Sequence, residues 1–150
     1  MAGLFGNFVI PDALAAPADL AAWTSTTAPT NAAALLREAT SMVLSATKGA
    51  YYAVDPATGL ATDPVVLKAL QDATCIQAAA WAALGIDPNL GGVITATVAS
   101  QKSIGSAHIT LADAAQAATA KERALNGLVP AAQRKLAQNN LLASNVWIYG

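Results

Sequence analysis

Apolar side chains recur every three or four residues along most of this chain, which is the spacing of helices with one buried face. The first long stretch of this kind begins near Asn31, a favourable N-cap. The second is bounded by Asp63 and Pro64, which favour a helix start, and by Gly85, which favours a helix end. Asp113 is expected to cap a third helix. The pattern predicts a short helix at residues 17–23 and four main helices at residues 31–48, 64–84, 114–126 and 130–140.

The second long helix has the widest apolar face, so we expect it to lie at the centre of a small helical bundle. Leu36 of the first long helix, with Leu70 and Trp81 of the second, are the predicted core residues between these two helices. No internal repeat or low-complexity linker divides the 150 residues, so the whole chain is expected to form a single domain. The predicted fold class is therefore mainly α.

Residues 91–111 break the helical pattern. Residues 93–98 are rich in β-branched side chains, and residues 104–111 alternate between apolar and polar positions. This pattern predicts an inserted β-hairpin or a long extended loop. Because an isolated two-stranded hairpin is marginally stable in water, we expect it to pack against another protein surface. Lys102 and Ile104 are the candidate residues for contact with a second subunit or with the lumen of a channel.

Neither end of the chain has a helical period. Residues 1–16 are interpreted as an N-terminal arm, and residues 141–150 as an irregular C-terminal tail. Trp and Tyr are enriched at protein interfaces, so the tail is a candidate docking segment for a partner. The alternative is that the tail folds back onto its own helices. The candidate interface residues of the tail are Val146, Trp147, Ile148 and Tyr149.

The composition favours a protein that assembles with others. Alanine occupies 38 positions, and it promotes helix formation while burying little area per residue. Charged residues make up 11% of the chain, against about 25% in an average soluble domain. The core is therefore thin and the surface poor in charge, which suggests that some apolar surface is buried against partners. The basic residues are scattered, which argues against a nucleic-acid-binding patch, and no apolar stretch is long enough to span a bilayer.

The residues that usually carry catalysis or bind metals have simpler interpretations here. His108 is the single histidine and is expected on the exposed face of the hairpin. Cys75, the single cysteine, is expected as a buried structural thiol, so no internal disulfide is possible and a reducing compartment is favoured. Asp72 follows Lys68 by four residues, which predicts a surface ion pair. Since no glycine-rich phosphate loop is present either, we expect no enzyme activity, no metal and no cofactor.

Several short segments occur in an order and spacing that carry more information together than singly. They extend over residues 16–150, whereas residues 1–15 and 90–99 fall outside the pattern. The segments are LLREATS at 35–41, YAVDPATG at 52–59, TDP at 62–64, LQDATC at 70–75, QAAAW at 77–81, KSIGSA at 102–107 and WIYG at 147–150.

In this order of segments the chain resembles the head-to-tail connector, or adaptor, proteins of long-tailed bacteriophages. The resemblance implies a helical-bundle subunit of the virion neck that is assembled in the host cytoplasm. It also implies a homo-oligomeric ring of twelve copies, placed between the portal protein and a stopper or other tail-side neck protein. The viral DNA would pass through the ring without sequence-specific binding, and no membrane would be involved.

Two other interpretations are open at this point. One is a different neck or head-completion protein, such as a stopper or a tail terminator, for which a larger share of β-structure is expected. The other is a small helical DNA-binding regulatory module, which requires a basic recognition helix. The fourth predicted helix offers Arg134 and Lys135 for that role, which is a weak match.

Overall fold

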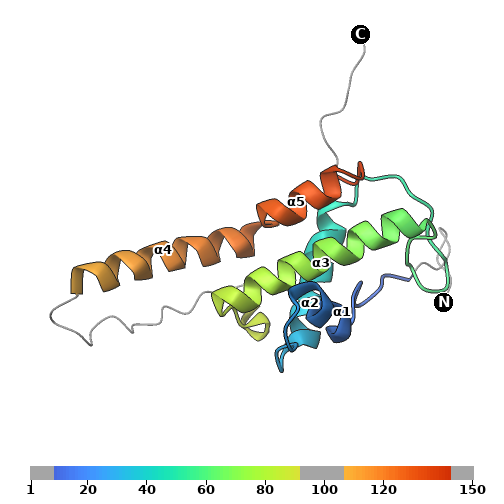
Figure 1. Cartoon of the computed structure of the whole chain (residues 1–150). Helices are drawn as coiled ribbons and strands as arrows, with labels where there is room; N and C mark the ends of the chain where they lie inside the picture. The colour runs from blue at the N-terminus through green and yellow to red at the C-terminus, as the bar shows by residue number, and fades with distance from the viewer. Residues whose placement is uncertain (1–8, 92–106, 143–150) are drawn as a thin grey trace, which may run out of the picture.

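A computed structural model describes residues 9–91 and 107–142 of the chain, and within these ranges the protein is mainly helical (Figure 1). The described residues contain an isolated antiparallel β-bridge between Val54 and Ala61 and no longer strand. The helical elements are α1 (Pro17–Thr24), α2 (Ala32–Ala46), α3 (Pro64–Leu84), the 3-10 turn η1 (Pro88–Leu90), α4 (Ala107–Asn126) and α5 (Pro130–Ala137).

The predicted mainly helical fold is confirmed, and the local signals at the ends of α3 act as expected. The Asp63 carboxylate accepts a hydrogen bond from the Val65 N–H at 2.8 Å, and Pro64 occupies the first helical position. Gly85 ends the helix with a φ of +68°, a left-handed conformation that glycine adopts without strain. At the start of α2, by contrast, Asn31 lies at the N-cap without a capping hydrogen bond from its side chain.

The predicted hairpin is wrong in its second half. Ala107 is the first residue of α4, so residues 107–111 are helical where a strand was expected. Asp113 consequently lies inside the helix and does not cap it. Starting a helix is costly, whereas extending one is cheap, so the alanine-rich run that follows carries the helix back through Ile109 and Thr110. Residues 92–106, which include Lys102 and Ile104, lie outside the described residues.

Helix α3 is the centre of the bundle. It packs against α1 and α2 on one side and against α4 and α5 on the other, where α4 and α5 follow each other along its length (Figure 1). Buried side chains form two clusters along α3. Leu36 and Trp81, 0% and 3% exposed, belong to the cluster near its C-terminal end. Leu70, 1% exposed, belongs to the second cluster, together with Ala132 and Leu136 of α5.

The N-terminal segment and the loop between α2 and α3 lie side by side at one end of the bundle (Figure 1). The Leu14 N–H donates a hydrogen bond to the buried hydroxyl of Thr40 at 2.9 Å, which attaches the end of the predicted arm to α2. Gly59 adopts a φ of +73°, and a Cβ there would collide with the carbonyl oxygen of Val9. Glycine at this turn therefore lets the two segments touch.

Replacing Trp81 by alanine should lower the free energy of unfolding by about 3–5 kcal/mol, because the indole fills the core between α2, α3 and α4. Urea denaturation measures this loss. The Trp81→Phe variant keeps most of the packing and should lose less. A loss below about 1 kcal/mol for Trp81→Ala would contradict the burial of this side chain.

Candidate functional site: an exposed helix and its anchor

The side chain of Gln77 connects α3 to the break between α4 and α5. Its Nε2 donates a hydrogen bond to the carbonyl oxygen of Ala124 at 3.1 Å, and its Oε1 accepts one from the Val129 N–H at 2.8 Å. Ala124 lies in the last turn of α4, where carbonyl groups lack partners within the helix, and Val129 is the N-cap of α5. One fully buried amide therefore satisfies backbone groups of two consecutive helices.

Trp81 adds a second bond to the same carbonyl group. Its indole Nε1 donates to the Ala124 oxygen at 2.8 Å, so this oxygen accepts from two side chains of α3. Gln77 and Trp81 are one helical turn apart and both face α4. Together they hold the C-terminal end of α4 against α3. We call Gln77, Trp81, Ala124 and Val129 the anchor.

Beyond the anchor, α4 runs out along the molecule toward its N-terminal end (Figure 1). Ala115, Gln116, Ala117, Ala118 and Thr119 are all exposed. Five consecutive helical residues point in every direction around the axis, so within the described part of the chain no element packs against this stretch on any side. We call residues 107–119 the α4 arm. Its sequence carries one acidic residue, Asp113, and no Lys or Arg.

A cavity of about 340 Å³ opens beside the anchor. Its floor is formed by apolar side chains, among them Met42 of α2, Trp81 of α3 and Leu125 of α4. Its rim is formed by the exposed residues Glu38, Ser41 and Ser45 of α2 and by the residues around η1. The two serines are small, so the rim along α2 is low. Met42 and Leu125 are half-buried, whereas Trp81 is only 3% exposed and lies beneath them.

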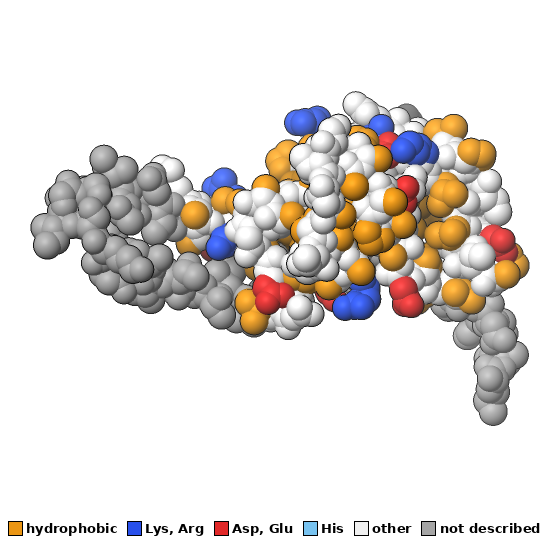
Figure 2. Space-filling model, turned by 60° about the horizontal axis from the view of Figure 1, so that its bottom comes forward, with side chains coloured by type: hydrophobic (Ala, Val, Ile, Leu, Met, Phe, Trp, Pro, Cys, Tyr) orange, Lys and Arg blue, Asp and Glu red, His pale blue; other side chains and the backbone are white. Residues whose placement is uncertain are grey.

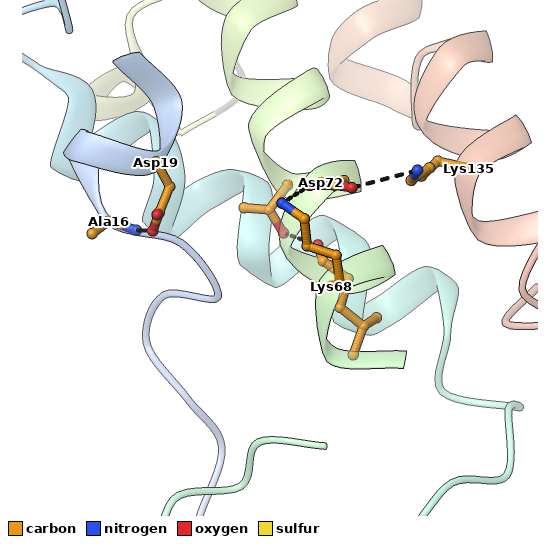
Figure 3. A network of polar contacts seen from close by, with 7 residues as sticks. Ala16, Asp19, Lys68, Asp72 and Lys135 are labelled. Carbon is orange, nitrogen blue, oxygen red and sulfur yellow. Dashed lines mark hydrogen bonds and ion pairs between the residues drawn. The ribbon is translucent and has the colours of Figure 1, made fainter. Parts of the chain in front are cut away.

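A buried carboxylate, Asp72, fastens α5 to α3 five residues before Gln77 (Figure 3). Asp72, 4% exposed, pairs with Lys68 at 2.9 Å and with Lys135 of α5 at 3.4 Å. The predicted pair with Lys68 therefore exists, but Asp72 is not at the surface. The hydrogen bond and the charge of Asp72 raise the pKa of Lys68, so the lysine stays protonated. The two ammonium groups neutralise the carboxylate and link α3 to α5.

Cys75 has the character expected of a structural thiol. It is 2% exposed and belongs to the core cluster that contains Trp81. Burial is the main cause that raises the pKa of the Cys75 thiol to about 11, and the charges of Asp19 and Asp72 act in the same direction. At neutral pH the group is thus a protonated thiol, which is a poor nucleophile and a poor metal ligand.

The structure places only part of the residue set predicted from the sequence. Leu36, Leu70 and Trp81 are buried, and Trp81 also belongs to the anchor. The packed bundle extends two residues into the predicted tail. Leu141 is 2% exposed, its N–H donates to the Leu136 carbonyl oxygen at 3.0 Å, and the partly buried Leu142 packs against the same core cluster. The remaining candidates fall outside the described residues; these are Lys102, Ile104, Val146, Trp147, Ile148 and Tyr149.

Sequence reasoning missed Gln77 as a structural residue and missed the α4 arm altogether. The signal for Gln77 was a polar side chain inside the most apolar stretch of the chain, where a buried hydrogen-bond partner is required. The signal for the arm was the run of alanines on both sides of Asp113, which favours a helix without saying what packs against it.

The face of the bundle shown in Figure 2 carries no patch of charge of one sign. On the face shown in Figure 2, the acidic and basic side chains are scattered among hydrophobic and polar ones. Exposed apolar side chains are present at the end of the bundle formed by the N-terminal segment and the α2–α3 loop. Ile10 is 69% exposed and Val65 is 64% exposed, and the Tyr51 side chain is fully exposed. Charged residues, among them Asp12 and Lys48, lie beside Ile10 at this end, whereas the sequence of the α4 arm carries a single charged residue, Asp113.

Replacing Gln77 by glutamate should make stability depend on pH. A carboxylate oxygen would face the Ala124 carbonyl in place of the amide donor, so burial and repulsion raise the pKa of the new group in the folded state. The variant should therefore be most stable below about pH 4, where the carboxyl group is protonated, and should lose stability as the pH rises through the raised pKa. Thermal melts between pH 4 and 8 measure this effect.

The matched control is Gln77→Met, which removes both hydrogen bonds without adding a titratable group. It should be destabilised by about 1–3 kcal/mol at every pH, because the Val129 N–H loses its partner. If Gln77→Glu and Gln77→Met follow the same pH profile, the Gln77 side chain does not face the Ala124 carbonyl.

The buried thiol predicts a stability loss in alkali. Since the pKa of Cys75 is higher in the folded state than its ordinary value near 9, the free energy of unfolding should fall as the pH rises from about 9 toward 11. A comparison with Cys75→Ala isolates the contribution of the thiol from that of the other groups in the protein. A thiol reagent should also react slowly with the native protein at neutral pH and rapidly in urea. Fast reaction of the native protein would contradict the burial.

Within the ranges 9–91 and 107–142, no helix is long and apolar enough to cross a membrane. In the same ranges, no three or more His, Cys, Asp or Glu residues come together in a way that could hold a metal ion. Comparison with models of protein families, with curated proteins and with solved structures finds no match.

Proposed function

We propose that this chain is a structural subunit of a bacteriophage neck, in which copies of it form a ring that joins the portal protein to the tail-side neck proteins. The observation that carries the proposal is the α4 arm, a helix held by buried hydrogen bonds at one end and exposed on all sides over residues 115–119. A helix of low charge that nothing covers in the described subunit is a surface for contact with other subunits.

The chemistry of the buried polar groups supports a structural role over catalysis. The side-chain amide of Gln77 and the carboxylate of Asp72 are both engaged in contacts that hold α4 and α5 on α3. Cys75 is protonated at neutral pH and lies in the core. These residues therefore hold the shape of the subunit, and we propose that the protein works by position and contact, without an enzymatic reaction, a metal or a cofactor.

The order of sequence segments described above supports the neck as the place of this assembly. The mainly helical fold favours an adaptor over a stopper or a tail terminator, which are expected to be richer in β-structure. The scattered charges favour a channel through which DNA passes over a DNA-reading module. The proposed partners are further copies of the chain in a twelve-membered ring, the portal, a stopper or other tail-side neck protein, and the DNA in transit.

Electron microscopy of the purified protein mixed with its portal protein tests the proposal. The expected result is an additional ring beneath the portal. A variant that lacks residues 146–150 should keep the melting temperature of the full chain and lose attachment to the portal, because Trp147, Ile148 and Tyr149 are the proposed docking residues.

The control for the truncation is the full-length Trp147→Ala variant, which keeps the chain length and should weaken attachment in the same direction. If no ring forms on the portal with the intact chain, the proposed function is wrong. If the ring forms equally well without residues 146–150, the tail is not the docking segment.

A further inference from the structure

The break between α4 and α5 begins with the pair Asn126–Gly127, the single place in the sequence where a glycine follows an asparagine. Asn126 is exposed and is the last residue of α4, and Gly127 lies outside the helix. Because helix ends fray, the side chain of Asn126 and the peptide nitrogen of Gly127 can meet without unfolding of the bundle. Glycine has no Cβ, so this nitrogen is open to close approach.

Neither the backbone conformation nor the packing requires glycine at position 127. In the described ranges, the glycines with a left-handed φ are Gly59, Gly85 and Gly91, and Gly127 is not among them. A Cβ at Gly127 would meet no atom beyond its chain neighbours within 4 Å. Alanine therefore fits at this position, so a Gly127→Ala variant changes the chemistry of the pair and leaves the fold intact.

The main chain on both sides of this pair is held by the anchor. The carbonyl oxygen of Ala124, two residues before Asn126, accepts hydrogen bonds from Gln77 at 3.1 Å and from Trp81 at 2.8 Å. The Val129 N–H, two residues after Gly127, donates to Gln77 at 2.8 Å. One side-chain amide thus spans the break, and it can do so only while the main chain between its two partners keeps its length.

We propose that Asn126 is a site of spontaneous deamidation, and that the isoaspartate formed there releases the C-terminal end of α4 from the anchor. The nitrogen of Gly127 bonds to Cγ of Asn126, the bond between Cγ and the amide nitrogen breaks, and ammonia leaves with the proton that Gly127 gives up. Water then opens the resulting succinimide ring and leaves a carboxylate. No group is oxidised or reduced, and the co-reactant is water.

The ring opens to two products, which differ in their effect on the anchor. Opening at Cγ gives aspartate, which adds a negative charge at the negative end of the α4 dipole and keeps the length of the main chain. Opening at the main-chain carbonyl gives isoaspartate, in which the main chain runs through Cβ and Cγ and gains a carbon atom. This product alone lengthens the chain between Ala124 and Val129, so it should break the bond between Val129 and Gln77.

Ageing the full chain in mildly alkaline buffer, where the Gly127 nitrogen loses its proton more readily, tests the site. Peptide mass spectrometry should find the mass gain of deamidation at Asn126, and an isoaspartate methyltransferase should label the same peptide. Gly127→Ala should slow both signals by roughly ten-fold or more, because its Cβ hinders the attacking nitrogen. Asn126→Gln keeps the glycine and should remove both signals, and circular dichroism melts check that the two variants are folded.

Asn89 is the internal reference, since it is also exposed but is followed by Leu90. If Asn89 deamidates as fast as Asn126 in the folded protein, or if Gly127→Ala reacts as fast as the unmodified chain, the proposed site is wrong.

Hydrogen exchange of the Val129 N–H measures the effect on the anchor. Ion-exchange chromatography separates the isoaspartate form, in which this amide should exchange roughly ten-fold faster or more than in the fresh protein, because its bond to Gln77 is lost. The control is Asn126→Asp, which carries the charge without the additional carbon atom and should exchange like the fresh protein. If the isoaspartate form also exchanges like the fresh protein, the anchor survives the modification and the proposed release is wrong.

Discussion

The buried amide of Gln77 is the interaction on which the arrangement of the C-terminal half depends. Helix α4 ends at Asn126 and α5 begins at Pro130. At this break the last carbonyl groups of α4 and the first N–H groups of α5 lack hydrogen-bond partners within their own helices. Without the Gln77 bonds, the Val129 N–H would be left without a partner, and the Ala124 carbonyl would keep only the bond from Trp81. With them, and with the Trp81 bond and the packing of Ala124 and Leu125, the C-terminal end of α4 is fixed against α3.

The Asp72 network has a related task five residues earlier in α3. A carboxylate in the core destabilises the fold unless charge and hydrogen bonds compensate it, and here two lysines do so from α3 and α5. Both lysine side chains remain partly open to water, 66% exposed for Lys68 and 33% for Lys135, while their ammonium groups reach the carboxylate. The two polar contacts of α3 thus have different roles. Gln77 stabilises the junction between α4 and α5, and Asp72 holds α5 against α3.

Features encoded by neighbouring residues were predictable from the sequence, and features that depend on distant partners were not. Asp63, Pro64 and Gly85 define the ends of α3 through their own backbone preferences, so the boundaries of that helix followed directly. The burial of Asp72 depends on Lys135, which is far away in the sequence, and a local rule assigned the residue to the surface. The Gln77 anchor likewise joins residues about fifty positions apart, beyond the reach of helical periodicity.

The wrong strand prediction at residues 107–111 has a different physical origin. Alternation over a few residues is a short signal, and it competes with the helix propensity of the alanines at 107, 112 and 114. Once the downstream helix exists, each further residue adds a hydrogen bond at little cost, so the longer element prevails. The candidate docking residues 102, 104 and 146–149 lie outside the described ranges, and for them the sequence interpretation stands as a prediction.

The alanines of the α4 arm serve both its stability as an exposed helix and its packing against a neighbour. A helix that nothing covers has no tertiary packing to hold it together, so its stability rests on helix propensity, where alanine is the strongest residue. A helix that later joins a neighbour has to shed little water and approach closely, and alanine also meets this demand, because its side chain is small and apolar. Larger apolar residues at 115, 117 and 118 would bury more apolar area in a contact between subunits. On the free subunit, however, they would form an exposed apolar patch that promotes aggregation. The same composition that makes the core thin therefore allows the arm to exist before assembly and to pack tightly within it.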